Sequence, residues 1–260
     1  MQPQITIVVP VWDDYVRYLD ACVASLRDQD PRPQVLVVDN ASQAPVPELT
    51  GTTVLRLTER LPVGDARNAA LERVGTDYVM FCDADDELAE GGLRALYDAL
   101  AGDLSLGFAG GRIARLRDDG GAAEPIDWPP SYVLRLARYP RLLAMRSLWL
   151  SSLPATCTLY RTEVARAAGG FGEGQLGEDW SFVTAVAFRA RGVLLDRPVR
   201  RYRMSEDSLF HRARSLTARR RAHRAVRRRM LRDPAVPLYV KALMPIFALH
   251  HWQFLRREPE

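Results

Sequence analysis

Three aspartates stand within four positions at the end of a short apolar run, in the stretch VMFCDADDEL (79–88). Like charges this close repel, so a cation, a helix N-terminus or solvent should offset Asp83, Asp85 and Asp86. Mg²⁺ and Mn²⁺ prefer carboxylate oxygens, and Mg²⁺ sites commonly use one or two carboxylates together with substrate phosphates. The same aspartates could instead open the next helix, where acidic side chains are favoured. The stretch alone leaves both interpretations open.

Two other places carry carboxylates of interest. Asp39 ends the apolar run QVLVVDNAS (34–42), where it could bind a nucleotide base or ribose or simply stabilise a polar turn. Glu178 and Asp179 follow the glycine-rich segment GGFGEGQL and begin a helical pattern. A carboxylate there could act as a general base toward a bound hydroxyl, or it could only stabilise the helix dipole.

Strand and helix patterns alternate in the first part of the chain. Buried strands are expected at 4–12, 34–42, 52–58 and 77–85, with helices at 13–30, 63–75 and 88–102. This alternation predicts an α/β fold with a parallel sheet and helices on both faces. Ligands bind at the carboxyl ends of the strands in such sheets, and both acidic turns fall at those ends.

The second part of the chain is less regular. It predicts a strand over 106–119, helical or irregular structure at the sheet edge over 128–150, and a strand with a short helix over 155–171. A helix over 177–192 and an extended segment over 193–204 complete the prediction.

Five blocks in order resemble the family-2 glycosyltransferases with the GT-A fold. They are VVPVW, VLVVDNAS, GDARNAAL, DYVMFCDADD and GEDWSF, within residues 4–205. The resemblance implies a Rossmann-like, mostly parallel central sheet in a domain of residues 1–205. The arginine-rich pattern after that domain predicts a basic helical extension of residues 206–260. The resemblance to the family implies that residues 1–105 bind a nucleotide sugar, that residues 106–205 bind an acceptor, and that the sugar is transferred with inversion.

The resemblance also implies roles for particular residues. Asp179 would be the catalytic base with Glu178 beside it, and Asp85 with Asp83 would hold Mn²⁺ or Mg²⁺. His211 resembles a further metal or phosphate contact, although an ordinary surface histidine is the alternative, and Asp86 is expected only to cap the next helix. The implied donor-binding residues, with Pro10 and Val11 expected in a loop at the strand end, are Pro10, Val11, Asp39, Arg67, Asn68, Asp83 and Ala84.

The donor and acceptor are less defined. The family often has Asp-Asp-Gly-Ser where this chain has Asp-Asn-Ala-Ser (39–42), which leaves the base open among uracil, thymine and guanine. We expect a UDP-sugar first and a dTDP-sugar next, with an acceptor hydroxyl on a sugar, a lipid-linked molecule or a natural product. The alternatives are a nucleotidyltransferase that makes sugar nucleotides, or a nucleotide-sugar-binding protein without catalysis. PVWDDY stands where a nucleotidyltransferase usually carries a glycine-rich loop.

The chain has a net charge of +4, yet ten arginines and no acidic residue lie between Arg212 and Arg232, so the remainder is acidic. This basic segment and the apolar one after it could pack on the body or in a homodimer, or bind anionic lipid; nucleic acid is disfavoured. Lys241 is the only lysine, which excludes a P-loop NTPase.

Cysteine usage and the lack of targeting signals predict the location. Cys22, Cys82 and Cys157 are far apart in sequence and odd in number, as expected for free thiols in a reducing compartment. The sequence shows no signal-peptide pattern and no spanning segment of about 18 apolar residues. We therefore expect a cytoplasmic protein, with the inner face of the membrane as a peripheral alternative.

Overall fold

The first strand is apolar except at Thr6 and is buried along its whole length. β1 (Ile5–Val11) lies between β2 (Gln34–Asp39) and β4 (Tyr78–Phe81) and pairs with both in parallel. β3 (Thr52–Arg56) adds to β2, also in parallel. Val, Ile and Leu dominate β1 and β2 because helices cover both faces of the sheet there.

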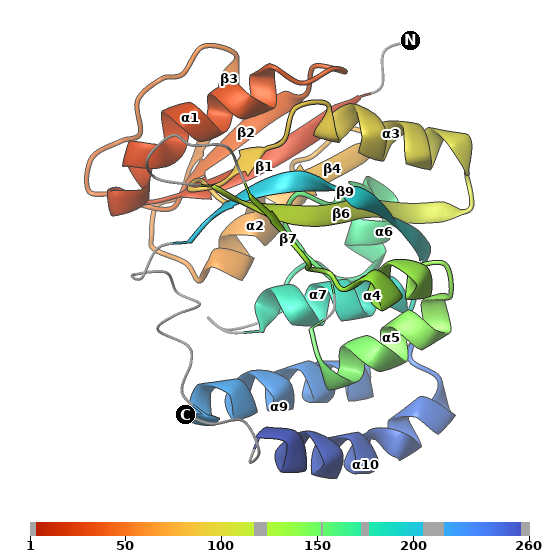
Figure 1. The fold of residues 1–260 in the computed structure, drawn as a ribbon. Coiled ribbons are helices and arrows are strands. Elements are labelled where there is room, and N and C mark those ends of the chain that lie inside the picture. Colours follow the sequence, from red (N-terminus) through yellow and green to blue (C-terminus); the bar gives the residue numbers. More distant parts are fainter. Residues whose placement is uncertain (1–3, 117–123, 152, 173–176, 205–215, 256–260) are drawn as a thin grey trace.

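The computed structural model describes residues 4–116, 124–151, 153–172, 177–204 and 216–255 (Figure 1). The remaining strands are β5 (Glu87–Leu88), β6 (Leu106–Leu116), β7 (Glu124–Ile126), β8 (Leu159–Arg161) and β9 (Arg191–Arg203). The helices are the 3-10 turn η1 (Asp13–Tyr15), α1 (Val16–Arg27), α2 (Val63–Leu71), α3 (Gly92–Gly102), α4 (Ser131–Leu136), α5 (Pro140–Trp149), α6 (Thr162–Ala167), α7 (Glu178–Ala187), α9 (Leu216–Arg232) and α10 (Leu238–Leu255).

The strands form one sheet in the order β3-β2-β1-β4-β8-β6-β9-β5, with β7 paired to β6. β8 is antiparallel to both β4 and β6, whereas β6 and β9 are parallel to each other. β9 therefore runs in the same direction as β4, and its last residues reach the same edge of the sheet. The predicted α/β fold with a mostly parallel sheet is confirmed.

The helices cover the sheet on two sides (Figure 1). One apolar cluster packs α1 and α3 on one face. The other cluster joins α2, α6 and α7 to the opposite face and extends through α4 and α5 to α9 and α10. Every residue from Trp180 to Ala187 of α7 is buried, because this helix lies between the sheet and the outer helices.

One expectation about helices is corrected. The helix expected over 88–102 begins only at Gly92, because Glu87 and Leu88 pair with β9 as the short strand β5. In the C-terminal segment, α10 continues through Pro245. Within the described ranges, no helix combines the length and apolar character needed to cross a membrane.

Candidate active site

The carboxyl ends of three parallel strands meet at one edge of the sheet. Val11 of β1 is paired with Asp39 of β2, and Val8 of β1 is paired with Phe81 of β4. Asp39 and the acidic loop (residues 83–86) therefore lie on either side of β1, two strand spacings or about 10 Å apart. The end of β9 comes to the same edge and contacts the acidic loop directly.

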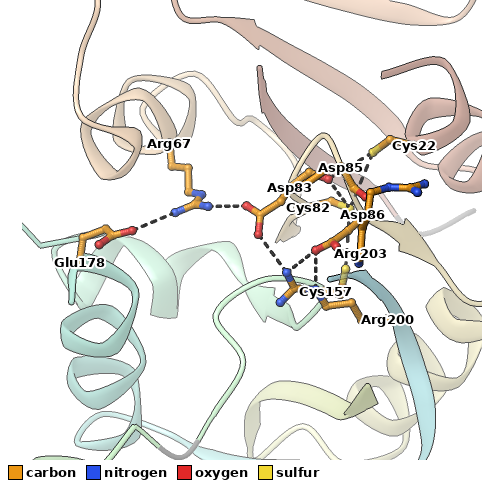
Figure 2. A network of polar contacts seen from close by, with 10 residues as sticks. All are labelled: Cys22, Arg67, Cys82, Asp83, Asp85, Asp86, Cys157, Glu178, Arg200 and Arg203. Carbon is orange, nitrogen blue, oxygen red and sulfur yellow. Dashed lines mark hydrogen bonds and ion pairs between the residues drawn. The ribbon is translucent and has the colours of Figure 1, made fainter. Parts of the chain in front are cut away.

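Arginines from distant segments offset the charge of Asp83 (Figure 2). Arg67 of α2 donates to Oδ1 of Asp83, and Arg200 of β9 donates to Oδ2 over 3.0 Å. Burial alone would raise the pKa of Asp83, but the two guanidinium groups outweigh it and hold the pKa below its ordinary value. Asp83 is therefore ionised at neutral pH, and the cations nearest to it belong to the chain itself.

Asp86 is completely buried and connects the acidic loop to β9. Nε of Arg200 donates to its Oδ2 over 2.6 Å, and the backbone N–H of Arg203 donates to its Oδ1 over 3.0 Å. Burial raises the pKa of Asp86 to about 7, although Arg200 opposes the shift. The expectation that Asp86 only caps a helix is wrong. α3 begins six residues later, and both carboxylate oxygens of Asp86 accept hydrogen bonds from residues of β9.

Asp85 differs from its two neighbours. Its side chain is half-buried, and within the described residues no arginine forms an ion pair with its carboxylate. Burial, followed by the charge of Asp83, raises the pKa of Asp85 to about 6. Asp85 is thus the carboxylate of the loop that remains available to a divalent cation.

The donor set suits a cation that shares its coordination with a ligand. The described residues contain no cluster of three or more His, Cys, Asp or Glu side chains placed to hold a metal, and His211 lies outside them. Asp85 and the partly exposed Asp83 would supply one or two carboxylates, which is the usual protein share at a site completed by phosphate oxygens and water. The residues present therefore fit Mg²⁺ or Mn²⁺ bound together with a diphosphate.

The two carboxylates at the start of α7 lie in different environments. Glu178 is buried, with Oε1 at 3.7 Å from Nη1 of Arg67, and burial followed by the charge of Asp179 raises its pKa to about 8. Asp179 is exposed, and its Oδ1 accepts the backbone N–H of Trp180 over 2.6 Å. Desolvation by nearby protein raises the pKa of Asp179, although water can still reach the side chain. Arg67 links this pair to the acidic loop.

Close approach of α2 to α7 depends on Gly64. A Cβ at this position would lie 3.0 Å from Cγ of Glu178 and 3.0 Å from the carbonyl oxygen of Gly172. Glycine thus lets Arg67, one turn further along α2, reach both Glu178 and Asp83.

Asn68 holds the loop before α7. Its Nδ2 donates to the carbonyl of Phe171 over 3.2 Å, and its Oδ1 accepts the N–H of Phe171 over 2.8 Å. Gly170 beside it has φ +65° and no room for a Cβ, which would lie 2.2 Å from Asn68 Oδ1. Nucleotide binding by Asn68 stays a prediction, because both of these hydrogen bonds hold the loop.

Asp39 is buried and holds its own loop. Its carboxylate accepts the N–H of Ser42 over 3.0 Å and of Val46 over 3.4 Å, and Arg56 Nη1 donates to it over 2.6 Å. The side chain of Asn40 exchanges two hydrogen bonds with the backbone of Leu61. Asp39 lies at the predicted edge, and its contact with a base stays a prediction.

Three other predicted donor-binding residues are buried. Pro10 and Val11 were expected in a loop, which is wrong: both belong to β1, and the turn begins at Trp12. Ala84 is buried within the acidic loop. The side chain that is accessible at this strand end is the half-exposed Trp12. The guanidinium carbon of Arg60 lies 4.6 Å from the centroid of its ring.

Three cysteines also gather beneath the acidic loop. Sγ of Cys82 lies 3.9 Å from Cys22 and 3.7 Å from Cys157, and all three are free and buried. A hydrogen bond to Cys82, together with burial, raises the pKa of Cys157 well above its ordinary value. Neutral thiols here add no negative charge next to the carboxylates.

Sequence reasoning missed Arg200, Arg203 and the cysteine cluster. The need for positive charge near three aspartates was visible in the sequence, as was the run VRRYR (199–203) in an extended segment. The pairing of these two features depends on strand order, which the sequence pattern does not specify.

A cavity of about 480 Å³ lies at the opposite edge of the sheet, away from the carboxylates. It is lined by the first residues of β6 and β9 and by Arg141, Arg161, Arg189 and Arg191. The chain itself uses three of these arginines: Arg161 donates to backbone carbonyls, Arg189 to Asp233 and Arg191 to Ser105. We do not assign this cavity to the site.

Comparisons with known proteins agree with this architecture. The family model described as glycosyl transferase family 2 matches residues 6–169. The crystal structure of S. aureus TarS 1-349 in complex with UDP-GlcNAc is similar, with 18% identity, a TM-score of 0.68, and coverage of 96% of this chain and 71% of that one. The mannosyltransferase PcManGT from Pyrobaculum calidifontis, solved with GDP-Man and Mn²⁺, has 19% identity, a TM-score of 0.63, and coverage of 99% and 71%. None of the curated proteins matches the chain. The match over more than half of its length shows that the chain belongs to glycosyl transferase family 2, with a GT-A-like fold.

Proposed function

We propose that this protein transfers a sugar from a nucleoside diphosphate sugar to an acceptor hydroxyl, with inversion at the anomeric carbon. The observation that carries the proposal is the chain of contacts Glu178–Arg67–Asp83–Arg200 at the carboxyl edge of the sheet (Figure 2). It joins the acidic loop, suited to a diphosphate and a cation, to the start of α7, where an exposed carboxylate is available to an acceptor. Family membership supports the same reaction class.

On the donor side, Asp85 and Asp83 would hold Mn²⁺ or Mg²⁺. The bound ion would offset the negative charge that develops on the diphosphate leaving group. Arg67 and Arg200 keep Asp83 ionised and fix its orientation. The similar structures were solved with UDP-GlcNAc and with GDP-Man and Mn²⁺, which supports a nucleotide-sugar donor and a divalent ion. We retain a UDP-sugar as the first choice and a dTDP-sugar as the next.

On the acceptor side, Asp179 would be the general base. As the acceptor oxygen forms its bond to the anomeric carbon, the bond from that carbon to the phosphate oxygen breaks, and the hydroxyl proton passes to Asp179. A single displacement of this kind inverts the configuration. Glu178, with its pKa raised to about 8, would be mostly protonated at neutral pH, which leaves Asp179 as the base of the pair.

Thermal unfolding in the presence of nucleotides tests the donor assignment. UDP with Mn²⁺ should raise the melting temperature more than dTDP or GDP with Mn²⁺, and more than UDP with EDTA. Stabilisation by nucleoside triphosphates together with pyrophosphate release would favour a nucleotidyltransferase instead. If none of the diphosphates stabilises the protein, the proposal fails at the donor. The anomeric configuration of the first product, measured by NMR, tests inversion, and a retained configuration would contradict a single displacement.

A further inference from the structure

The outer helix α10 exposes an apolar face. Val240 and Met244 pack inward on the body, whereas the opposite face carries several large apolar side chains in water. Leu238 is 83% exposed, Ile246 62% and Leu249 58%, with Tyr239 and Leu243 also exposed between them. Spacings of three and four residues place Tyr239, Leu243, Ile246 and Leu249 on one face of the helix, and Leu238 joins it about three turns before Leu249. An apolar face of this kind marks an interaction surface.

The neighbouring helix α9 exposes a row of arginines. Val226 and Met230 are buried on its inner face, and Arg221, Arg224, Arg228 and Arg232 are exposed on the opposite face. These four positions are again three or four residues apart and form one stripe. α9 contains no acidic residue that could neutralise them.

The two faces belong to one layer of the molecule. α9 packs against α10, and together they form the part of the molecule furthest from the sheet (Figure 1). On each helix the buried residues face the body, so the arginine row and the apolar face are both on its outer side. We call these two stripes together the α9–α10 face.

We propose that the α9–α10 face docks on an anionic lipid membrane. Such a surface offers phosphates to the arginines and the boundary of the acyl chains to the leucines and Ile246 at the same time. The tyrosine between them suits the interface, where one end of its ring is apolar and its hydroxyl meets water. The proposal does not depend on which sugar or acceptor the enzyme uses.

Charge distinguishes a membrane from a second copy of the chain. In a two-fold dimer the same face of both copies would meet, bringing one arginine row toward the other without acidic residues of α9 between them. Like charges brought together in an interface oppose association. An anionic lipid surface has the complementary charge.

Sedimentation of the full chain with vesicles tests this proposal. Vesicles of phosphatidylcholine mixed with phosphatidylglycerol should bind the protein, and vesicles of phosphatidylcholine alone should bind it at least about tenfold more weakly. Replacing Arg221, Arg224 and Arg228 by Gln should weaken binding by about fivefold for each arginine. Replacing Leu238, Ile246 and Leu249 by Ser should weaken it by about tenfold or more.

Matched variants elsewhere provide the controls. Leu104→Ser changes an equally exposed leucine, and Arg197→Gln changes an exposed arginine of β9. Both should bind anionic vesicles as the wild type does.

Equal binding to the two lipid mixtures, or face variants that bind like the controls, would overturn the proposal. So would light scattering that finds dimers which the three serine substitutions dissociate, because the face would then join two copies. If a face variant does not fold, vesicle binding of the wild type, measured against lipid composition and salt concentration, still tests the proposal. Binding that does not change with salt would contradict a contribution from the arginines.

Discussion

Replacing Arg200 by Met should strongly destabilise the protein, because it removes the cation shared by two carboxylates. Arg200 is buried and contacts Asp83 over 3.0 Å and Asp86 over 2.6 Å. The substitution keeps most of the apolar volume but leaves the completely buried Asp86 without its guanidinium partner. Breaking a buried ion pair from one side costs about 3–5 kcal/mol. Against a total stability of about 5–15 kcal/mol, this loss is large yet leaves a measurable folded state.

Urea unfolding measures the effect, with the same m-value (the slope of unfolding free energy against urea concentration) used for both proteins. A loss of this size should lower the urea midpoint by about 1–2 M. Arg197→Met is the matched control, since Arg197 lies on the same strand, is exposed, and donates to the backbone carbonyl of Glu90. It should change stability by no more than about 0.5 kcal/mol.

The second carboxylate allows a double-mutant cycle. Asp86→Asn keeps an oxygen for the N–H of Arg203 and removes the charge. Combined with Arg200→Met, it should cost about 1–3 kcal/mol less than the sum of the two single changes, because both substitutions remove the same interaction between Arg200 and Asp86. Strict additivity, or a loss below about 1 kcal/mol for Arg200→Met, would refute the reasoning that this arginine neutralises the loop.

Three further predictions concern the two sides of the reaction and the C-terminal helices. Asp179→Asn should lower turnover about 10²- to 10⁴-fold while leaving the donor Kd from calorimetry unchanged, and unchanged turnover would remove Asp179 as the base. Asp85→Asn should weaken the Mn²⁺-dependent part of nucleotide binding about tenfold or more in a metal titration, whereas an unaltered titration would place the ion elsewhere. Arg189 holds the pKa of Asp233 below its ordinary value despite partial burial, so this pair should stabilise the fold above about pH 4, with the contribution lost as pH falls below the folded pKa. Urea midpoints measured against pH should show Asp233→Asn destabilised by about 1–3 kcal/mol near neutrality and little changed in strong acid; an equal loss at both would exclude the ion pair as the cause.

Local patterns predicted most of the elements. The apolar runs that became β1, β2 and β4 are long enough and bounded clearly enough to be read directly, and α7 was visible from its acidic first turn and apolar continuation. The two residues of β5 were not recognisable, because such a short strand exists only through its pairing with β9. Because a helical pattern follows these two residues, the sequence predicted a start of α3 that is too early.

The candidate site was predictable as a set of carboxylates but not as a network. Asp83, Asp85 and Asp179 stand in recognisable blocks, so their types and positions pointed to the site. The role of Asp86 was misjudged because its partners, Arg200 and the backbone of Arg203, are more than a hundred residues away. A run of arginines in sequence is typical of a solvent-exposed surface. Arg200 is buried only because β9 lies beside β5. The cysteines gather for the same reason, since Cys22 lies on α1, which packs on this sheet, and Cys82 and Cys157 lie next to the paired strands β4 and β8.

The distance along the chain between the acidic loop and Arg200 has a consequence for how the protein folds. The four parallel strands β1 to β4 and their helices can assemble from nearby segments, but Asp83 and Asp86 contact Arg200, which lies 114–117 residues later in the chain. Contacts this remote require a large loop to close first, which slows folding. During synthesis, the early part of the chain emerges with its aspartates still facing water. We therefore expect the docking of β9 to be a late step, in which the network at the carboxyl edge and the second half of the sheet form together.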